Sequence, residues 1–273
     1  MKGRQTGSKE VKKAGNYIEK EFKKYGLNPK GENGFRQKFE AKVKKVKVED
    51  SIRMAENIIG FLDNGAEKTI IIGAHYDHVG HGELGNSRDT LNIGKIHNGA
   101  DDNASGTAGL LELARFYSSN KIKEPFNFLF IAFGAEELGL VGSKYFTENP
   151  TVSLDQIHWM LNMDMIGRYN PENGLAVIGY GTSSTFPLIF EGIECELKLN
   201  LSKDGNGGSD QTSFYKKDIP VLFFHTGGHP DYHKIGDDAE KIDYKTLWQI
   251  LELEINVINS SMKISEMDFI WTN

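Results

Sequence analysis

Residues 69–77 read TIIIGAHYD, and this stretch decides the fold. Its apolar residues follow one another without polar alternation, a pattern typical of a strand buried on both faces. Two later runs, at 126–133 and 219–224, have the same character. Because a strand buried on both faces must be covered on both sides, these runs predict a sheet that lies between two layers of helices.

Helical patterns lie between the buried runs, at about 105–118, 138–148 and 244–262. Strands that alternate with helices predict an α/β fold of three layers, with a mixed, mostly parallel twisted sheet and helices on both faces. No internal repeat, low-complexity tract or proline- and serine-rich linker interrupts the chain. We therefore expect one domain that spans residues 1–273.

The N-terminal part of the chain predicts a helix and then two strands. Ser8 is a suitable N-cap for a helix whose apolar residues recur every three or four positions, and Gly26 ends it. Apolar and polar residues then alternate over 35–43. The alternation is interrupted at residues 44–45 and resumes out of phase at Val46 and Val48. This pattern predicts a strand, a bulge or turn, and a second strand.

The composition excludes several classes of function. Of 273 residues, 38% are hydrophobic and 26% charged, and no apolar run approaches the roughly 20 residues that span a bilayer. Residues 1–50 carry 15 Lys/Arg against 7 Asp/Glu, but these lysines lie between the apolar positions of the predicted helix and strand, so we expect no nucleic-acid binding. The one cysteine, Cys195, cannot form an intramolecular disulfide, and no signal-peptide pattern is visible.

Side chains that can bind metals follow each buried run. In open α/β sheets, ligands bind beyond the carboxyl ends of the strands, so these side chains are expected to converge at one edge. The candidates are His75 and Asp77, Glu136 and Glu137, Asp164, and Tyr232 and His233, together with Asp101 and Asp102 at the start of a helix.

Each candidate has an ordinary structural explanation when it is taken alone. A histidine at a strand end is usually hydrogen-bonded, the Asp-Asp-Asn of residues 101–103 suits a helix N-cap, and two glutamates suit a helix start. Asp164 is different, because an unpaired carboxylate between Met163 and Met165 would be costly to bury. Five such groups at one sheet edge therefore favour a metal site.

The residue types indicate zinc, or manganese or cobalt in its place. Two histidines and three carboxylates form a ligand set that suits these ions. Five side chains exceed the three protein ligands that are usual for one catalytic zinc, so the count predicts two ions that share one carboxylate. Glu136, the spare carboxylate beside Glu137, is then free to act as a general base.

Five motifs follow one another in a fixed order along the chain. They are HYD at 75–77, GADDNASG at 99–106, AEELG at 135–139, NMD at 162–164 and YH at 232–233. In order and spacing the chain resembles the di-zinc exopeptidases of the bacterial leucyl aminopeptidase type, whose relatives include plasma glutamate carboxypeptidase and glutaminyl cyclase. The likeness extends from residue 4 to about residue 244. The chain lacks the protease-associated domain that some of these relatives carry before the first motif.

The resemblance implies a zinc exopeptidase fold and a ligand for each position of a zinc pair. His75 and Asp164 would bind one Zn2+ ion, and Glu137 and His233 would bind the other. Asp102 would bridge the two ions.

The resemblance also implies the catalytic roles. Glu136 would be the general base, Asp77 would orient the first histidine ligand, and Tyr232 would stabilise the oxyanion. A cis peptide bond between Asp102 and Asn103 is implied as well. One departure is at residues 209–211, where Ser-Asp-Gln replaces the Ser-Asp-His of many relatives.

The expected function is that of a metallo-aminopeptidase, which hydrolyses the N-terminal peptide bond of peptides with a free N-terminus. A carboxypeptidase or dipeptidase of the same family is the nearest alternative, because these motifs do not encode which substrate terminus is bound. A glutaminyl cyclase is a further alternative, although relatives with that activity bind one zinc and lose the Asp-Asp-Asn-Ala-Ser-Gly pattern. The family analogy favours an exported protein. The motifs leave the side-chain preference, native metal and oligomeric state open.

Overall fold

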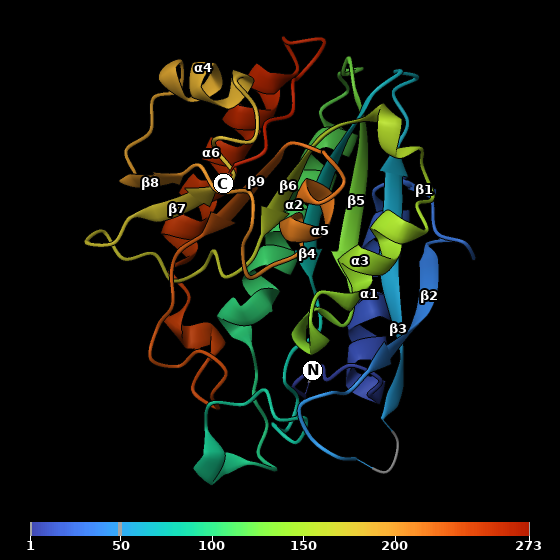
Figure 1. Cartoon of the computed structure of the whole chain (residues 1–273), viewed down its shortest axis with the longest axis vertical. Helices are drawn as coiled ribbons and strands as arrows, with labels where there is room; N and C mark the ends of the chain where they lie inside the picture. The colour runs from blue at the N-terminus through green and yellow to red at the C-terminus, as the bar shows by residue number, and fades with distance from the viewer. Residues whose placement is uncertain (1, 49–50, 273) are drawn as a thin grey trace.

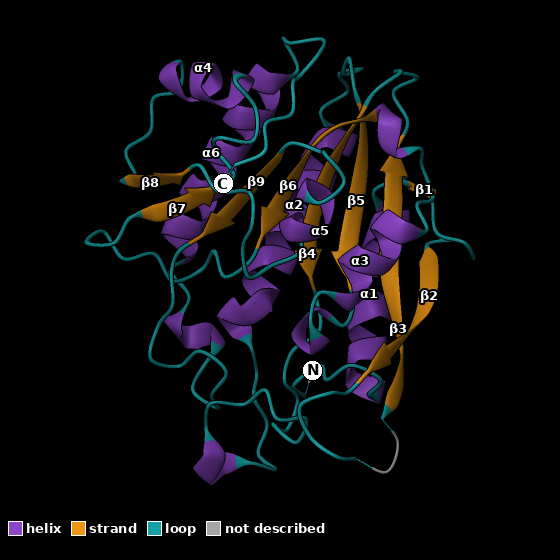
Figure 2. Cartoon of the chain, in the orientation of Figure 1, coloured by secondary structure: helices purple, strands orange, loops and turns teal. Residues whose placement is uncertain are grey.

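The computed structural model describes residues 2–48 and 51–272, which contain a nine-stranded sheet (Figures 1 and 2). The strands lie in the order β1-β3-β5-β4-β6-β9-β7-β8, and β2 pairs with β3 outside this row. Their bounds are Asn28–Pro29 (β1), Arg36–Lys42 (β2), Ile52–Leu62 (β3), Thr69–His75 (β4), Asn127–Phe133 (β5), Ile157–Met163 (β6), Leu175–Ile178 (β7), Leu199–Ser202 (β8) and Val221–His225 (β9).

The centre of the sheet is parallel, and antiparallel pairs lie on either side of it. Strands β5, β4, β6 and β9 run in one direction, whereas β3 is antiparallel to β5 and β7 is antiparallel to β9. Every residue of β4, β5 and β6 is buried, as their continuous apolar sequence predicts. The predicted mixed sheet is therefore confirmed, with its parallel part at the centre.

Helices cover both faces of the sheet (Figure 2). Ile70 and Ile72 of β4 belong to one buried cluster with residues of α1, α2 and α6, whereas Ile71 belongs to a second cluster with residues of α3 and α5. This division confirms the three layers. The helices are α1 Lys9–Lys24, α2 Gly106–Ser119, α3 Val141–Glu148, α4 Thr185–Glu191, α5 Gln211–Tyr215 and α6 Tyr244–Ser261. In the described part of the chain, no helix is both long and apolar enough to cross a bilayer.

The N-terminal prediction is half correct. The side chain of Ser8 accepts a hydrogen bond from Val11 N and caps α1. The second strand predicted at Val46 and Val48 is wrong, because residues 43–48 form no strand. The register explains the difference, since Lys42 of β2 already pairs with the first residue of β3 and the valines lie in the connection between the two strands.

The register brings the predicted site residues to one edge. His75 pairs with Phe133 at the ends of β4 and β5, and Met163 pairs with Phe224 near the ends of β6 and β9. Figure 1 shows the arrowheads of these four strands on the same side of the sheet. The residues that follow each strand therefore start from neighbouring positions.

Candidate metal centre

The first group of ligand atoms surrounds His75, the last residue of β4. Its Nε2 atom lies 3.3 Å from Asp164 Oδ1 and 3.4 Å from Asp102 Oδ1. Asp164 directly follows β6, which is the neighbour of β4, so the sheet itself places this pair. The His75 ring is buried, and its Nδ1 atom lies 3.2 Å from the backbone carbonyl oxygen of Asp77.

The second group surrounds His233, which lies on a loop. Its Nε2 atom is 3.0 Å from Asp102 Oδ2 and 3.2 Å from Glu137 Oε2. Glu137 belongs to the short helix η3 (Glu136–Leu138), which follows β5. The Nδ1 atom of His233 lies 2.6 Å from the carbonyl oxygen of Asn86, and this contact fixes the ring through a second loop.

Asp102 is common to both groups, and one oxygen of its carboxylate faces each histidine. It lies in the segment η2 (Ala100–Ser105), where the backbone angles of Asp102 and Asn103 are not helical, and the Asp102–Asn103 peptide bond is cis, as predicted. Asp102 Oδ2 and Asp164 Oδ1 are buried, yet neither accepts a well-directed hydrogen bond from a described residue. Buried carboxylate oxygens normally have partners, so these two atoms are available to bind a cation.

The distances between ligand atoms fit a tetrahedral metal. With bonds of about 2.0–2.1 Å, a tetrahedral zinc ion separates its ligand atoms by roughly 3.3–3.4 Å. The four distances from the two histidine nitrogens to carboxylate oxygens range from 3.0 to 3.4 Å. The five predicted ligands therefore form two half-sites: His75 and Asp164 on one side, Glu137 and His233 on the other, and Asp102 between them.

A third imidazole, that of His78, also borders the second half-site. Its Nδ1 atom lies 3.0 Å from Glu137 Oε1 and 3.6 Å from Asp102 Oδ2, and these three residues form one of two groups whose atoms are close enough to hold an ion. The other group is His75, Asp102 and Asp164. The structure thus places His78 in contact with the predicted ligand Glu137.

The carboxylates of the site favour positive charge, as the raised pKa values of two histidines show. Burial would lower the pKa of His233, but the carboxylates of Glu137 and Asp102 raise it to about 10. The pKa of His75 is likewise raised well above its usual value, against the effect of burial, by Asp164 and Glu136. Buried carboxylates outnumber these two imidazoles, and a pair of divalent cations would balance them.

Glu136 lies beside the first half-site, with its Oε2 atom 3.9 Å from His75 Nε2. Burial raises its pKa well above the usual value for a glutamate, and the negative charge of Glu137 adds to this effect. Its backbone N–H donates to Asp77 Oδ1 at 3.0 Å. The carboxylate of Asp77 is 3.8 Å from His75 Nδ1, so its carbonyl oxygen, rather than its carboxylate, is the nearer partner of that ring.

Tyr232 lines a cavity of about 390 Å³ together with most of the predicted ligands. Its ring centroid lies 4.0 Å from that of His233. Burial and the nearby carboxylates raise the pKa of its hydroxyl, which therefore stays protonated and able to donate a hydrogen bond. Ile178 and Phe223 contribute apolar surface to the same cavity, and Gly208 also lines it.

Three supporting residues were missed by the sequence analysis. The hydroxyl of Thr6 donates to Asp77 Oδ2 at 2.7 Å. The buried guanidinium of Arg4 donates to the carbonyl oxygens of Tyr76, Asn98 and Gly99, which lie next to the metal motifs. The carboxylate of Asp237 accepts hydrogen bonds from the backbone N–H groups of Asp101 and Asp102. No local pattern marks these residues, although Arg4 and Thr6 belong to the segment where the family resemblance begins.

Two aspartates near the site have separate surroundings. Asp101 Oδ1 accepts hydrogen bonds from Ser105 Oγ and Gly167 N, and its Oδ2 atom lies 3.2 Å from His229 Nε2, whereas Asp102 faces His75 and His233. Asp210 is fully buried, and burial raises its pKa to about 7. Gln211 stands where many relatives have histidine, and its Oε1 atom accepts a hydrogen bond from the side chain of Asn162 near the end of β6.

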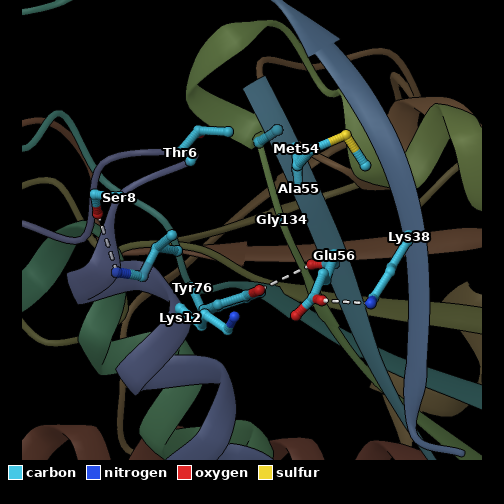
Figure 3. Close-up of a pocket in the computed structure, with 12 residues that line it drawn as sticks. Thr6, Ser8, Lys12, Lys38, Met54, Ala55, Glu56, Tyr76 and Gly134 are labelled. Carbon is cyan, nitrogen blue, oxygen red and sulfur yellow. Dashed lines mark hydrogen bonds and ion pairs between the residues drawn. The ribbon is translucent and has the colours of Figure 1, made fainter. Parts of the chain in front are cut away.

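A separate pocket of about 290 Å³ lies between the start of α1 and strands β2 and β3, and Figure 3 shows the residues that line it. Thr6 and Tyr76 line it, and the hydroxyl of Tyr76 donates to the carbonyl oxygen of Glu56 (Figure 3). None of the five predicted metal ligands lines this pocket. The 390 Å³ cavity, which four of the five predicted ligands line, is therefore the candidate active site.

An α/β sheet with histidine and carboxylate side chains gathered at the carboxyl ends of its parallel strands is typical of metal-dependent hydrolases. The model of peptidase family M28 matches residues 57–258, which include all five predicted ligands, and the chain belongs to this family.

Individual relatives agree with this membership. The chain is 31% identical to leupeptin-inactivating enzyme 1 of Streptomyces exfoliatus over 68% of its own length and 38% of that protein's length. Among solved structures it is similar to BSAP, a zinc aminopeptidase from Bacillus subtilis, with 26% identity, a TM-score of 0.60, and coverage of 78% of this chain and 51% of that one. A glutaminyl cyclase from Bacteroides thetaiotaomicron shares the fold, with 21% identity, a TM-score of 0.72, and coverage of 93% and 91%. The chain thus spans about two fifths of the first relative and half of the second.

Proposed function

We propose that this protein is a zinc-dependent aminopeptidase that hydrolyses the N-terminal peptide bond of peptides, with two ions bridged by Asp102 and with Glu136 as general base. The observation that carries the proposal is the position of the Asp102 carboxylate, whose two oxygens lie 3.4 Å from His75 Nε2 and 3.0 Å from His233 Nε2. A carboxylate that turns one oxygen toward each of two histidines suits a ligand shared by two ions. The zinc aminopeptidase from Bacillus subtilis, as a relative, supports the choice of metal and reaction.

Each ion has its own ligands in this proposal. His75 and Asp164 hold one, Glu137 and His233 hold the other, and Asp102 holds both. When bound, zinc acts as a Lewis acid that polarises the scissile carbonyl group and makes a water molecule more acidic. The carboxylates around the site attract the free α-amine of the substrate, and this attraction restricts cleavage to the terminal residue.

Glu136 moves the proton in the reaction. Its carboxylate accepts a proton from the attacking water and delivers it to the leaving amine nitrogen. Burial favours this role, because a desolvated carboxylate with a raised pKa is a stronger base than an exposed one. The N–H of Glu136 bonds to the buried Asp77 carboxylate, so the base is fixed relative to the loop of the first histidine ligand.

Tyr232 acts on the other reacting atom. Its hydroxyl keeps its proton, because burial and the surrounding carboxylates raise its pKa. It can therefore donate a hydrogen bond to the carbonyl oxygen as negative charge develops there.

The substitution Glu136→Gln tests the assignment of the base. We expect a loss of roughly 10²–10⁴ in kcat with the zinc content and fold unchanged, because the amide cannot accept the proton. Activity on leucyl-p-nitroanilide, zinc by atomic emission and circular dichroism are the measurements. Glu148→Gln, at an exposed position on α3, is the matched control. A variant at position 136 that keeps near-normal turnover would remove this residue from its role.

A panel of substrates separates the proposal from its rivals. An aminopeptidase cleaves aminoacyl p-nitroanilides and ignores peptides with a blocked N-terminus, whereas a carboxypeptidase cleaves the blocked peptides. A glutaminyl cyclase converts N-terminal glutamine and needs one ion, so a stoichiometry of two zinc ions per chain argues against it. Loss of activity with o-phenanthroline and its return with added zinc establish that the reaction depends on the metal.

A further inference from the structure

One cation, that of Arg88, lines the 390 Å³ cavity beside the carboxylates of Asp102, Glu136 and Asp164. It comes from the long loop between the first two metal motifs. The guanidinium carbon lies 4.6 Å from the centroid of the Tyr232 ring, within the range of a cation–π contact. Arg88 has no part in the metal site or in the proton transfer, so its position calls for a separate explanation.

The backbone around Arg88 is fixed to the metal site. The N–H of Arg88 donates to the carbonyl oxygen of His233 at 3.0 Å, and the carbonyl oxygen of Asn86 contacts the ring of the same histidine. The N–H of Asp89 donates to Ser87 Oγ. The backbone of residues 86–89 is thus held on both sides of Arg88, and its side chain starts from a position fixed relative to His233.

The donors of the guanidinium are free. Arg88 forms no ion pair, and its side chain forms no hydrogen bond, with any residue in the described ranges 2–48 and 51–272. The guanidinium lies against the Tyr232 ring, and Arg88 is exposed and lines the cavity. A planar guanidinium with a free edge matches a carboxylate through two parallel hydrogen bonds.

We infer that Arg88 binds the C-terminal carboxylate of a dipeptide substrate, so that the protein prefers dipeptides to longer or amidated peptides. This inference rests on the proposed aminopeptidase function. In a dipeptide, the carboxylate carbon is three bonds from the scissile carbonyl carbon, and both fit within one cavity. The α-amine then lies among the carboxylates of the site, and the carboxylate at the opposite end of the zwitterion lies at Arg88.

The test compares the kcat/KM of Leu-Gly with that of Leu-Gly-amide, which differs only in lacking the carboxylate. We expect the zinc-loaded protein to prefer the free acid about tenfold or more, as for a charge-assisted bidentate contact. Arg88→Met should reduce the ratio to about 1, and Arg88→Lys should keep part of it. The ratio isolates the carboxylate, because any effect of the substitution on Tyr232 acts on both substrates. Arg115→Met, at an exposed position on α2, is the matched control and keeps the ratio.

A second readout and a third substrate complete the experiment. Calorimetric titration of the Glu136→Gln variant with both peptides should give the same preference in Kd. Leu-Asp-amide, which has its carboxylate on the side chain, shows which carboxylate is bound. A ratio of 1 in the unchanged protein with both peptides cleaved, or a preference for Leu-Asp-amide alone, overturns the inference and leaves the aminopeptidase proposal standing. Failure to cleave either Leu-Gly peptide or leucyl-p-nitroanilide overturns both.

Discussion

The two half-sites are built in different ways. In the first, His75 and Asp164 follow adjacent parallel strands, so the sheet register sets their distance. In the second, Glu137 and His233 come from a short helical turn and a loop, and contacts to residues 86 and 88 hold the histidine. In the second half-site a further imidazole, His78, contacts the ligand carboxylates, whereas His225, beside the first half-site, contacts only the backbone carbonyl oxygen of Asp164 among the described hydrogen bonds. The comparison indicates a rigid half-site and a more tolerant one.

The largest effects are expected from two single substitutions, each of which removes the histidine of one half-site. His75→Ala should lower kcat/KM by about 10⁴-fold or more, because it leaves three buried carboxylates, including that of Glu136, without their common partner. His233→Ala should cost about 10²–10³-fold, since His78 stays beside Glu137 and Asp102.

The measurements are leucyl-p-nitroanilide kinetics and zinc content after dialysis against a mild chelator. We expect His233→Ala to keep one ion and His75→Ala to lose activity even at high zinc. His81→Ala, in the same loop but lining neither half-site, is the control. Equal losses in the two variants would remove the distinction between the half-sites.

A smaller effect should follow from Thr6→Val, which acts only on the first half-site. The change removes the hydroxyl that donates to the buried Asp77 carboxylate, and this carboxylate also holds the N–H of Glu136. Groups that orient metal ligands typically contribute 10–100-fold, so we expect a loss of roughly tenfold in kcat and a weaker first ion.

Thr6→Ser keeps the donor and should restore most of the rate, which a purely structural role of the methyl group would not explain. Zinc titration with a competing indicator measures each ion separately. If the second ion weakened as much as the first, the two half-sites would not be independent.

The smallest effect concerns Glu254 on α6, a buried carboxylate that belongs to neither half-site. It has no hydrogen-bond partner in the described structure, and burial alone raises its pKa well above 4.5. Because the folded pKa is the higher one, stability is greatest below 4.5 and falls as the pH rises toward the folded value. Glu254→Gln removes this slope, so its melting temperature should exceed that of the unchanged protein at pH 8 by more than at pH 4.5.

The size of the shift follows from the scale for a chain of this length, roughly 2–4 °C per kcal/mol. Thermal unfolding of both proteins at several pH values, at one zinc concentration, gives the difference directly. Parallel curves for the two proteins would mean that Glu254 stays ionised in the fold.

Sequence reasoning predicted the parts of this molecule that depend on local pattern. The buried runs 69–74 and 126–133 lie at the centre of the sheet, as predicted, and the candidate ligands His75, Glu137 and Asp164 lie at the ends of neighbouring parallel strands, because such strands end at the same edge. The choice of Asp102 over Asp101 came from the family resemblance, and Asp101 has its own backbone partners.

The remaining features depend on contacts between distant segments. The second strand predicted at residues 46–48 failed because pairing with β3 ends at Lys42, which alternation of side chains cannot reveal. Arg4 and Asp237 reach the site across about 95 and 135 residues, and no spacing rule connects such pairs. Arg88 was missed for the same reason, since its relation to Tyr232 exists only in the folded chain.

The contact of Arg4 with three carbonyl groups has a practical consequence for anyone who shortens or tags this chain. The segment before α1 holds the loop that precedes Asp102 through the hydrogen bonds of Arg4, although it contains no predicted ligand. A truncation that removes Arg4, or a fusion partner that displaces this segment, should therefore produce a folded protein that fails to retain its zinc.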